Sequence, residues 1–543
     1  MKYLRFVNSF LVFVSLVLFF SSCAEKKGDK TKISGADTGN MYIGWASADI
    51  TPDKPVIIHG QFHARISEGV MDPVTATALA IESGKGESSE KAILISCDLV
   101  FISDDLRDAV RNLVKESLPE LDRHQIILNG THTHSAPQYA ASREVINELA
   151  PGFSVTSDIK SVYGIELDAM EFSDCRDFLS EQIAKAARQA WKNRKPGGIS
   201  FGLGQAVVGH NRLETNLSGK SVMYGKTNTP EFSHIEGYED HSVNLLYTWD
   251  KYSKLTGVVV NIACPSQVSE SEYFINADYW HDTRLEVRQR LGNDVYILPQ
   301  CSAAGDQSPH LMVGAKGEER MQRIMGPDSI KTGRGSMGRR KQIATYIADA
   351  VTSVFPYMKN NIEWSPYFKH RMEIVELSRQ LLSIEDVNKE VEEAEVWKKQ
   401  YEKMFLEINS NPEMKQKPRW YVNVTSAHRR ILRGYGVKSR YELLKVQPKM
   451  PVEVHVLRIG DVAIATNPFE LYLDYGMRIK GRSPAVQTFL VQLCGHGSYL
   501  PTARAVAGES YGAIPTSTLI GPEGGQELVE KTLELINSLW IKN

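Results

Sequence analysis

The stretch that decides the fold is residues 125–137, which read QIILNGTHTHSAP. It begins with an apolar, β-branched run and ends with two histidines one residue apart, His132 and His134. Such a run predicts a buried strand that delivers both imidazoles at its C-terminal end. Imidazole is the commonest protein ligand for zinc and the commonest general base near neutral pH. Taken alone, the same pattern also fits a polar turn with two surface histidines.

The same design, an apolar β-rich run that turns abruptly polar, recurs at five other places in the chain. These runs are residues 91–97, 257–263, 294–298, 461–466 and 486–493. In open α/β sheets, ligands bind beyond the carboxyl ends of the strands, and functional groups concentrate in the loops that follow. We therefore expect an α/β fold, with mixed β-sheets flanked by helices, in which these strand ends form one composite site.

Several of these segments resemble motifs of the neutral, non-lysosomal ceramidases, which are zinc-dependent hydrolases that split the amide bond of ceramide. THTHSAP at residues 131–137 is similar to the family's GTHTHSGP, and AAGDQSP at residues 303–309 is similar to its LGDVSP. NPFELYLDYGMRIK (467–480) resembles its GEFT segment, and GSYLPT (497–502) its YxTT-like loop. The resemblance runs in order from about Met41 to the C-terminus and is poor over residues 365–450.

The resemblance implies a Zn²⁺ cofactor and a role for each matching residue. Three of the implied metal ligands match the family's own, and they are His132, Glu470 and Tyr499. The implied catalytic residues are Ser308, Asp306 beside it, His134, and Arg212 in the segment GHNRLETN. A zinc-bound water, with its pKa lowered towards ~7, would attack the amide carbonyl. Whether Ser308 instead attacks as a covalent nucleophile is left open.

Cys264 marks the place where the chain departs from the family. The segment IACPSQ (262–267) stands where the family has AVHPTS, so that Cys264 replaces a second zinc histidine. A thiolate is a good zinc ligand, and Cys264 could complete a tetrahedral site. In the alternatives, the metal site lacks this ligand, or His281 or Asp278 completes it, or Cys264 is a small buried hydrophobe.

Three functions compete on this evidence. The first is a ceramidase-type amidase that converts N-acylsphingosine to sphingosine and fatty acid. The second is a zinc-dependent deacylase of another substrate, such as an acylated glycan or amino sugar, and both Cys264 and the divergent middle of the chain favour it. The third is a binding lipoprotein on a catalytically inactive ceramidase scaffold. The expected ligand is a lipid or an acylated small molecule.

A net charge of −2 without a long basic run argues against nucleic-acid binding.

The N-terminal segment predicts export. Residues 1–23 combine positive charge, an apolar core and a small-small-Cys ending, as in a bacterial lipoprotein signal peptide. Cys23 would carry a lipid anchor to the membrane, residues 24–40 would form a flexible tether, and the protein would reside in the bacterial cell envelope, in the periplasm or as an outer-membrane lipoprotein. Residues 41–543 are expected to form one catalytic domain with a helical insertion at about 380–445. Ser383 and Asp386 predict a capping box at the start of that insertion.

Overall fold

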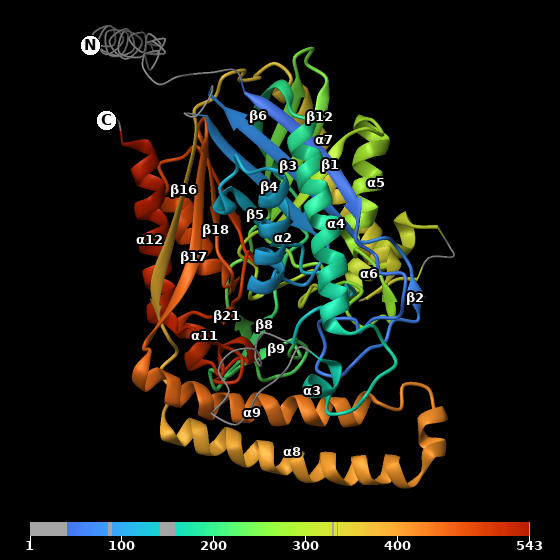
Figure 1. Ribbon diagram of the computed structural model, residues 1–543. Helices are drawn as coiled ribbons and strands as arrows, with labels where there is room; N and C mark the ends of the chain where they lie inside the picture. The colour runs from blue at the N-terminus through green and yellow to red at the C-terminus, as the bar shows by residue number, and fades with distance from the viewer. Residues whose placement is uncertain (1–40, 85–88, 142–157, 328–330, 334, 542–543) are drawn as a thin grey trace, which may run out of the picture. The chain divides into compact units, whose positions relative to one another are not determined.

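Two mixed β-sheets carry the fold, and the predicted α/β class is confirmed (Figure 1). The larger sheet has eight strands in the order β14 (Tyr296–Cys301), β12 (Leu255–Ile262), β11 (Ser242–Asp250), β6 (Lys195–Gln205), β1 (Tyr42–Asp49), β3 (Thr75–Ser83), β4 (Glu90–Cys97) and β5 (Ile126–Gly130). The smaller sheet has the order β16 (Phe368–Ser378), β17 (Lys449–Ile459), β18 (Val462–Thr466) and β20 (Gln487–Val491).

This computed structural model describes residues 41–84, 89–141, 158–327, 331–333 and 335–541. The predicted signal peptide, Cys23 and the predicted tether lie outside the described residues. Among the described helices, none is both long enough and apolar enough to cross a bilayer.

The six strands predicted from apolar runs all form, and they form three parallel pairs. β4 pairs with β5, β12 with β14, and β18 with β20, while most of the other pairings in the two sheets are antiparallel. Each parallel pair is joined through a helix, which is α2 (Asp104–Ser117), α5 (Tyr279–Leu291) or α10 (Leu473–Arg482). Because strands that are covered on both faces need apolar side chains on both faces, these six read as continuous hydrophobic runs.

The carboxyl ends of the three parallel pairs converge. The Asn129 side chain at the end of β5 donates a hydrogen bond to the carbonyl of Pro299 in β14, at 3.3 Å. The Asn261 side chain in β12 donates to the carbonyl of Leu490 in β20, at 2.6 Å. The larger sheet therefore curls until its two edge strands meet, and the smaller sheet packs against them.

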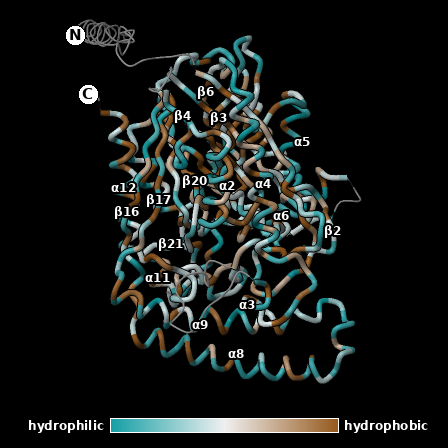
Figure 2. Tube along the Cα trace, in the orientation of Figure 1, coloured by the Kyte–Doolittle hydropathy of each residue, from teal (hydrophilic) through white to brown (hydrophobic). Residues whose placement is uncertain are grey.

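Helices cover the outer faces of both sheets. α2 and α4 (Phe172–Lys192) pack against β1, β3 and β4, and α5 and α7 (Met337–Met358) cover the half that contains β11 and β12. α10 and α12 (Pro522–Trp540) cover the smaller sheet, and a further apolar core lies between the two sheets. Figure 2 shows hydrophobic residues concentrated on the strands of the two sheets.

A long helical hairpin follows β16 and lies across the end of the molecule at which the site segments gather (Figure 1). It consists of α8 (Ile384–Ser410) and α9 (Val422–Val446), which pack side by side. The capping box of Ser383 and Asp386 begins α8. α9 packs on the body through α3 (Ile159–Tyr163) among other elements, and α8 contacts it through Tyr401, whose hydroxyl donates to the carbonyl of Gly164 at 2.8 Å.

Short elements complete the described chain. The short strands are β2 (Gly69–Val70), β7 (His210–Asn211), β8 (Leu213–Asn216), β9 (Ser221–Met223), β10 (Phe232–Ile235), β13 (Phe274–Ile275), β15 (Gln307–Ser308), β19 (Glu470–Leu471) and β21 (Tyr499–Leu500). The short helices are η2 (Arg123–Gln125), α6 (Ala315–Met325), η3 (Pro412–Gln416), α11 (Ala503–Ala507) and η4 (Tyr511–Ala513).

Candidate functional site

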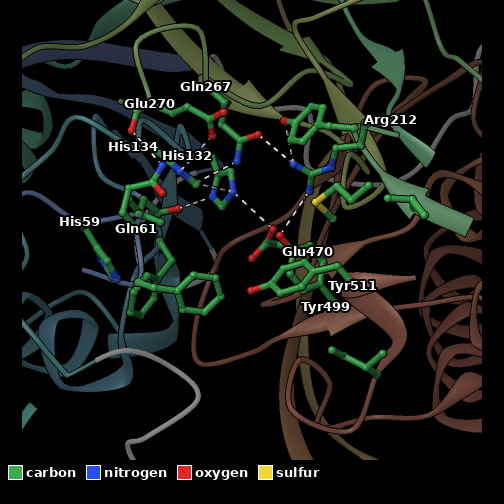
Figure 3. A pocket seen from close by; sticks show the side chains of 18 of the residues that line it. His59, Gln61, His132, His134, Arg212, Gln267, Glu270, Glu470, Tyr499 and Tyr511 are labelled. Carbon is green, nitrogen blue, oxygen red and sulfur yellow. Dashed lines mark hydrogen bonds and ion pairs between the residues drawn. The ribbon is translucent and has the colours of Figure 1, made fainter. Parts of the chain in front are cut away.

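A cavity of about 670 Å³ opens at the converging strand ends (Figure 3). The residues that line the cavity include five of the predicted site residues, which are His132, His134, Arg212, Glu470 and Tyr499. Further wall residues come from the loop after β1, from β9, and from helix α9. The position agrees with the rule that ligands bind beyond the carboxyl ends of parallel strands.

His132 is held in a fixed orientation by its own backbone and by one ring nitrogen. Its φ of 67° is in the left-handed region, which is sparsely populated by residues other than glycine and is concentrated at functional sites. Its backbone N–H donates to the carbonyl of Leu99 at 2.9 Å, and Nδ1 donates to the carbonyl of Val100 at 2.8 Å. With Nδ1 protonated in this way, Nε2 carries the lone pair that faces the cavity.

Glu470 and Tyr499 line the same cavity as His132, and they lie in segments that follow strands β18 and β20 of the smaller sheet. They are direct partners in the short parallel pair of β19 and β21. Nε2 of His132 lies 3.4 Å from Oε2 of Glu470. Burial, and next the carboxylate of Glu470, raise the pKa of Tyr499 well above its ordinary value. The structure thus brings the predicted ligands His132, Glu470 and Tyr499 together.

Arg212 is a buried cation in the wall of the cavity. It donates to the carbonyl of Gly305 at 2.9 Å, to Oε1 of Gln267 at 3.0 Å and to the hydroxyl of Tyr499 at 3.3 Å. Burial alone would lower the pKa of Arg212, but the neighbouring Tyr499, Tyr224 and Glu470 raise it well above its ordinary value. Arg212 therefore stays charged and is aimed at the cavity by three acceptors, of which Gln267 and Tyr499 are labelled in Figure 3.

His134 lies beside His132 and is held by two residues that sequence reasoning missed. Its Nε2 is 3.4 Å from Nε2 of His132 and 2.9 Å from Nε2 of Gln267, which can donate to it. Its Nδ1 lies 3.8 Å from a carboxylate oxygen of Glu270. Burial, followed by the charge of His132, lowers the pKa of His134 well below its ordinary value. Gln267 is in the same CPSQ segment as Cys264, and a scan of that loop for polar side chains would have found it.

Cys264, the proposed fourth ligand, does not line the cavity in the described structure. It is fully buried in an apolar cluster, and its thiol donates to the carbonyl of Val208 at 3.4 Å. Burial raises the pKa of Cys264 to about 12. The two residues proposed as alternative ligands have other contacts. Asp278 caps α5, and His281 lies 3.6 Å from Asp72.

Ser308 and Asp306 lie behind the cavity wall. The Ser308 hydroxyl is fully buried and accepts the backbone N–H of His310 at 3.1 Å. The Asp306 carboxylate accepts the Asn211 side chain at 2.8 Å and the N–H of Leu473 at 2.9 Å, and burial raises the pKa of Asp306 to about 6. In the described structure neither residue lines the cavity. Their loop contacts Arg212 through two carbonyls: that of Gly305 accepts from the guanidinium at 2.9 Å, and that of Asp306 accepts the backbone N–H at 2.9 Å.

The outer wall of the cavity is a second feature that the sequence motifs did not reveal. Phe62 and Tyr511 make an edge-to-face contact with ring centroids 6.1 Å apart, and Tyr511 makes another with Tyr499 at 5.9 Å. Helix α9 adds Arg429 to the wall, and its Arg433 donates to the hydroxyl of Tyr511 at 3.1 Å. These contacts join elements that are far apart in the sequence and follow no local pattern.

The residues at the inner end of the cavity fit a divalent metal ion. Ligands placed 2.0–2.1 Å from a tetrahedral zinc lie roughly 3.4 Å from one another, which matches the distance from His132 Nε2 to Glu470 Oε2. An imidazole, a carboxylate and a phenol leave the fourth position open, as in catalytic zinc sites. A different possible metal-binding group, His210, Glu239 and His241, lies outside this cavity wall.

Comparison with known proteins identifies the fold. A crystal structure of neutral ceramidase from Pseudomonas aeruginosa matches with a TM-score of 0.62 and 15% identity, over 92% of this chain and 74% of that chain. A structure of ceramidase complexed with C2 matches with the same TM-score and identity, over 92% of this chain and 75% of that chain. No family model and no curated protein sequence matches the chain. The likeness concerns architecture, and the chain therefore has a ceramidase-like fold.

Proposed function

We propose that this protein is a zinc-dependent hydrolase that cleaves an N-acyl amide bond. The observation that carries the proposal is the meeting of His132, Glu470 and Tyr499 beside the buried cation Arg212, at the inner end of one cavity. These residues come from four separate segments. Three potential metal ligands beside a buried cation have no evident structural purpose on a cavity wall. The ceramidase-like fold supports a hydrolase of this kind.

The proposed metal would be held by Nε2 of His132, the carboxylate of Glu470 and the hydroxyl of Tyr499. When bound there, zinc supplies a water of lowered pKa and polarises a carbonyl oxygen. Tyr499 would ligate through its hydroxyl oxygen, which also accepts a hydrogen bond from Arg212 at 3.3 Å. His132 is prepared for the role because its Nδ1 is already committed to the carbonyl of Val100.

The remaining wall residues would act on the substrate directly. Arg212 is positioned to hold the developing negative charge of the carbonyl oxygen, because its charge is fixed and its donors are preorganised. His134, which its lowered pKa keeps neutral and which Gln267 orients, would accept a proton from the attacking water and then pass it to the leaving nitrogen. The proposal gives Ser308 no role on the substrate, because Ser308 does not line the cavity and its buried hydroxyl accepts the backbone N–H of His310.

The outer wall of the cavity favours the second candidate substrate class, which is an acylated sugar or another polar amine, over ceramide. Alongside Phe62 and Tyr511 it presents the charged side chains of Glu270, Arg429 and Glu509. Covering charges with two hydrocarbon chains would cost free energy without any compensating hydrogen bond. A polar head group with hydroxyls or ionised groups could make hydrogen bonds with these side chains. We also propose export and a lipid anchor at Cys23, from the N-terminal sequence.

The test is a paired measurement of bound metal and turnover. Purified wild-type protein should contain a zinc ion at the cavity that is lost, together with amide hydrolysis, in His132→Ala and in Glu470→Gln. A panel of N-acyl amino sugars, N-acyl amino acids and short-chain ceramides would assign the substrate class. His63→Ala is a matched control, since His63 is a histidine of the neighbouring loop that does not line the cavity. Wild-type protein that binds no zinc at the cavity would refute the proposal.

A further inference from the structure

We infer that His210, Glu239 and His241 form a second metal site, outside the cavity, for a divalent transition ion such as Zn²⁺. His210 is in β7, and the other two residues are in the loop between β10 and β11. Among the described residues, these three form the group of three or more histidine, cysteine and carboxylate side chains whose ligand atoms all lie within 4.8 Å of one another. The inference is independent of the proposed function.

The distances within the group match a metal coordination sphere. Oε2 of Glu239 lies 3.3 Å from Nδ1 of His210 and 2.9 Å from Nε2 of His241. Ligands on a tetrahedral zinc, with bonds of 2.0–2.1 Å, are roughly 3.4 Å apart. A small outward movement of His241, which is partly exposed, would therefore make room for the ion.

The ligand chemistry selects the class of ion. Two imidazoles with one carboxylate suit zinc and its neighbours in the transition series, while calcium and magnesium prefer all-oxygen sites. The ring of His210 is buried, and its Nε2 has no hydrogen-bond partner in the described structure. The side chains of Glu239 and His241 are each 33% exposed, so that an ion can enter from solvent and keep a water ligand.

The location indicates what the ion would do. His210 lies two residues before Arg212, and the second oxygen of Glu239 accepts the backbone N–H of Asn211 at 3.3 Å. Asn211 in turn donates to Asp306 at 2.8 Å. An ion bound here would tie the loop at residues 236–241 to β7, and would thereby fix the segment that carries Arg212 into the cavity. The role would be structural, with no contact between this ion and the substrate.

The competing explanation is a metal-free trio in which both histidines donate to the same carboxylate oxygen. Metal stoichiometry separates the two. We would strip the mature protein with a chelator, add one to three equivalents of Zn²⁺, remove the excess by desalting, and measure zinc per chain in wild type, Glu239→Gln and His241→Ala. Both substitutions are at partly exposed side chains, so the fold should survive them. His234→Ala is the matched control, since His234 is an exposed histidine of β10 outside the group.

The inference predicts that Glu239→Gln and His241→Ala each lose one equivalent of zinc relative to wild type and to His234→Ala. It also predicts that Zn²⁺ raises the Tm of His132→Ala, in which the cavity ligand is removed, but not that of the double variant His132→Ala/His241→Ala. Equal zinc content in wild type, Glu239→Gln and His241→Ala would overturn it. Loss of the cavity zinc alone, in His132→Ala, bears on the proposed function and leaves this inference intact.

Discussion

A guanidinium nitrogen of Arg212 lies 3.3 Å from the hydroxyl of Tyr499, across 287 residues of sequence. Tyr499 is in turn the strand partner of Glu470, whose carboxylate is 3.4 Å from His132. One buried cation is thus connected to the residues that we propose as metal ligands. The chemistry of the cavity depends on this link between segments that are far apart in the sequence.

Arg212→Lys should reduce turnover by about 100-fold or more while leaving bound zinc unchanged. A lysine has one compact charge and cannot donate to Gly305, Gln267 and Tyr499 at once, so the charge would no longer be aimed at the carbonyl oxygen. The kcat of the variant and its metal content would be measured together. Arg478→Lys, at an exposed arginine, is the control. Full activity in Arg212→Lys would exclude this role.

Ser308→Ala should lower stability and leave turnover per folded molecule within about twofold of wild type. The hydroxyl accepts the buried N–H of His310, and removing it leaves that donor unpaired at a cost of about 1–3 kcal/mol. Chemical denaturation and kcat, measured on the same preparation, test this expectation. The opposite result, in which activity is lost and stability is unchanged, would establish the catalytic role of Ser308 that the family resemblance implies.

Cys264→Ser should leave bound zinc unchanged, because the thiol is buried among apolar side chains and not in the cavity. The serine hydroxyl can still donate to the carbonyl of Val208, so the loss of stability should be about 1 kcal/mol. Cys264→His should overpack the same position and cost about 1–3 kcal/mol. Zinc content and denaturation curves would be recorded for both variants. Zinc lost in Cys264→Ser and restored in Cys264→His would establish the thiolate as a ligand.

Arg433→Ala should raise KM several-fold with little change in kcat. Arg433 supports the outer wall of the cavity, because it donates to Tyr511 and Ser517 and its guanidinium lies 4.7 Å from the ring centroid of Phe62. Its loss should loosen the aromatic wall and leave the inner residues in place. Lys438→Ala, at an exposed position of the same helix, is the control. An effect confined to kcat would contradict a role in substrate binding.

Acidification from pH 7 to pH 5 should destabilise the wild-type protein more than His370→Gln. His370 is 2.9 Å from His455, which contacts Glu453, and burial followed by the charge of His455 lowers the pKa of His370 to about 3. Below about pH 6.5 the unfolded chain therefore binds a proton that the folded chain does not, and stability falls as the pH falls. We expect a difference of about 1 kcal/mol by pH 5, since His370 is only partly buried.

This pH dependence would be measured as Tm and as denaturation midpoints at pH 7, 6 and 5. His234→Gln, at an exposed histidine, should retain the wild-type dependence. Identical slopes in wild type and His370→Gln would show that the proton uptake occurs elsewhere.

The sequence by itself determined the six strands that surround the site, because a strand that is buried on both faces must be apolar along its whole length and its end is marked by the change to polar residues. It also predicted His132, Glu470 and Tyr499 as metal ligands through motif resemblance, and all three line the same cavity. Only the tertiary structure decided which neighbours of those strand ends face the cavity. Each loop leaves its strand along its own path. The loop after β5 passes through the left-handed conformation of His132. The loop after β12 brings Gln267 to His134 at the cavity and buries Cys264 in the core, and the Ser308 hydroxyl accepts a backbone N–H. Contacts of helix α9 with Phe62 and Tyr511 likewise depend on packing between distant segments, which no local periodicity encodes.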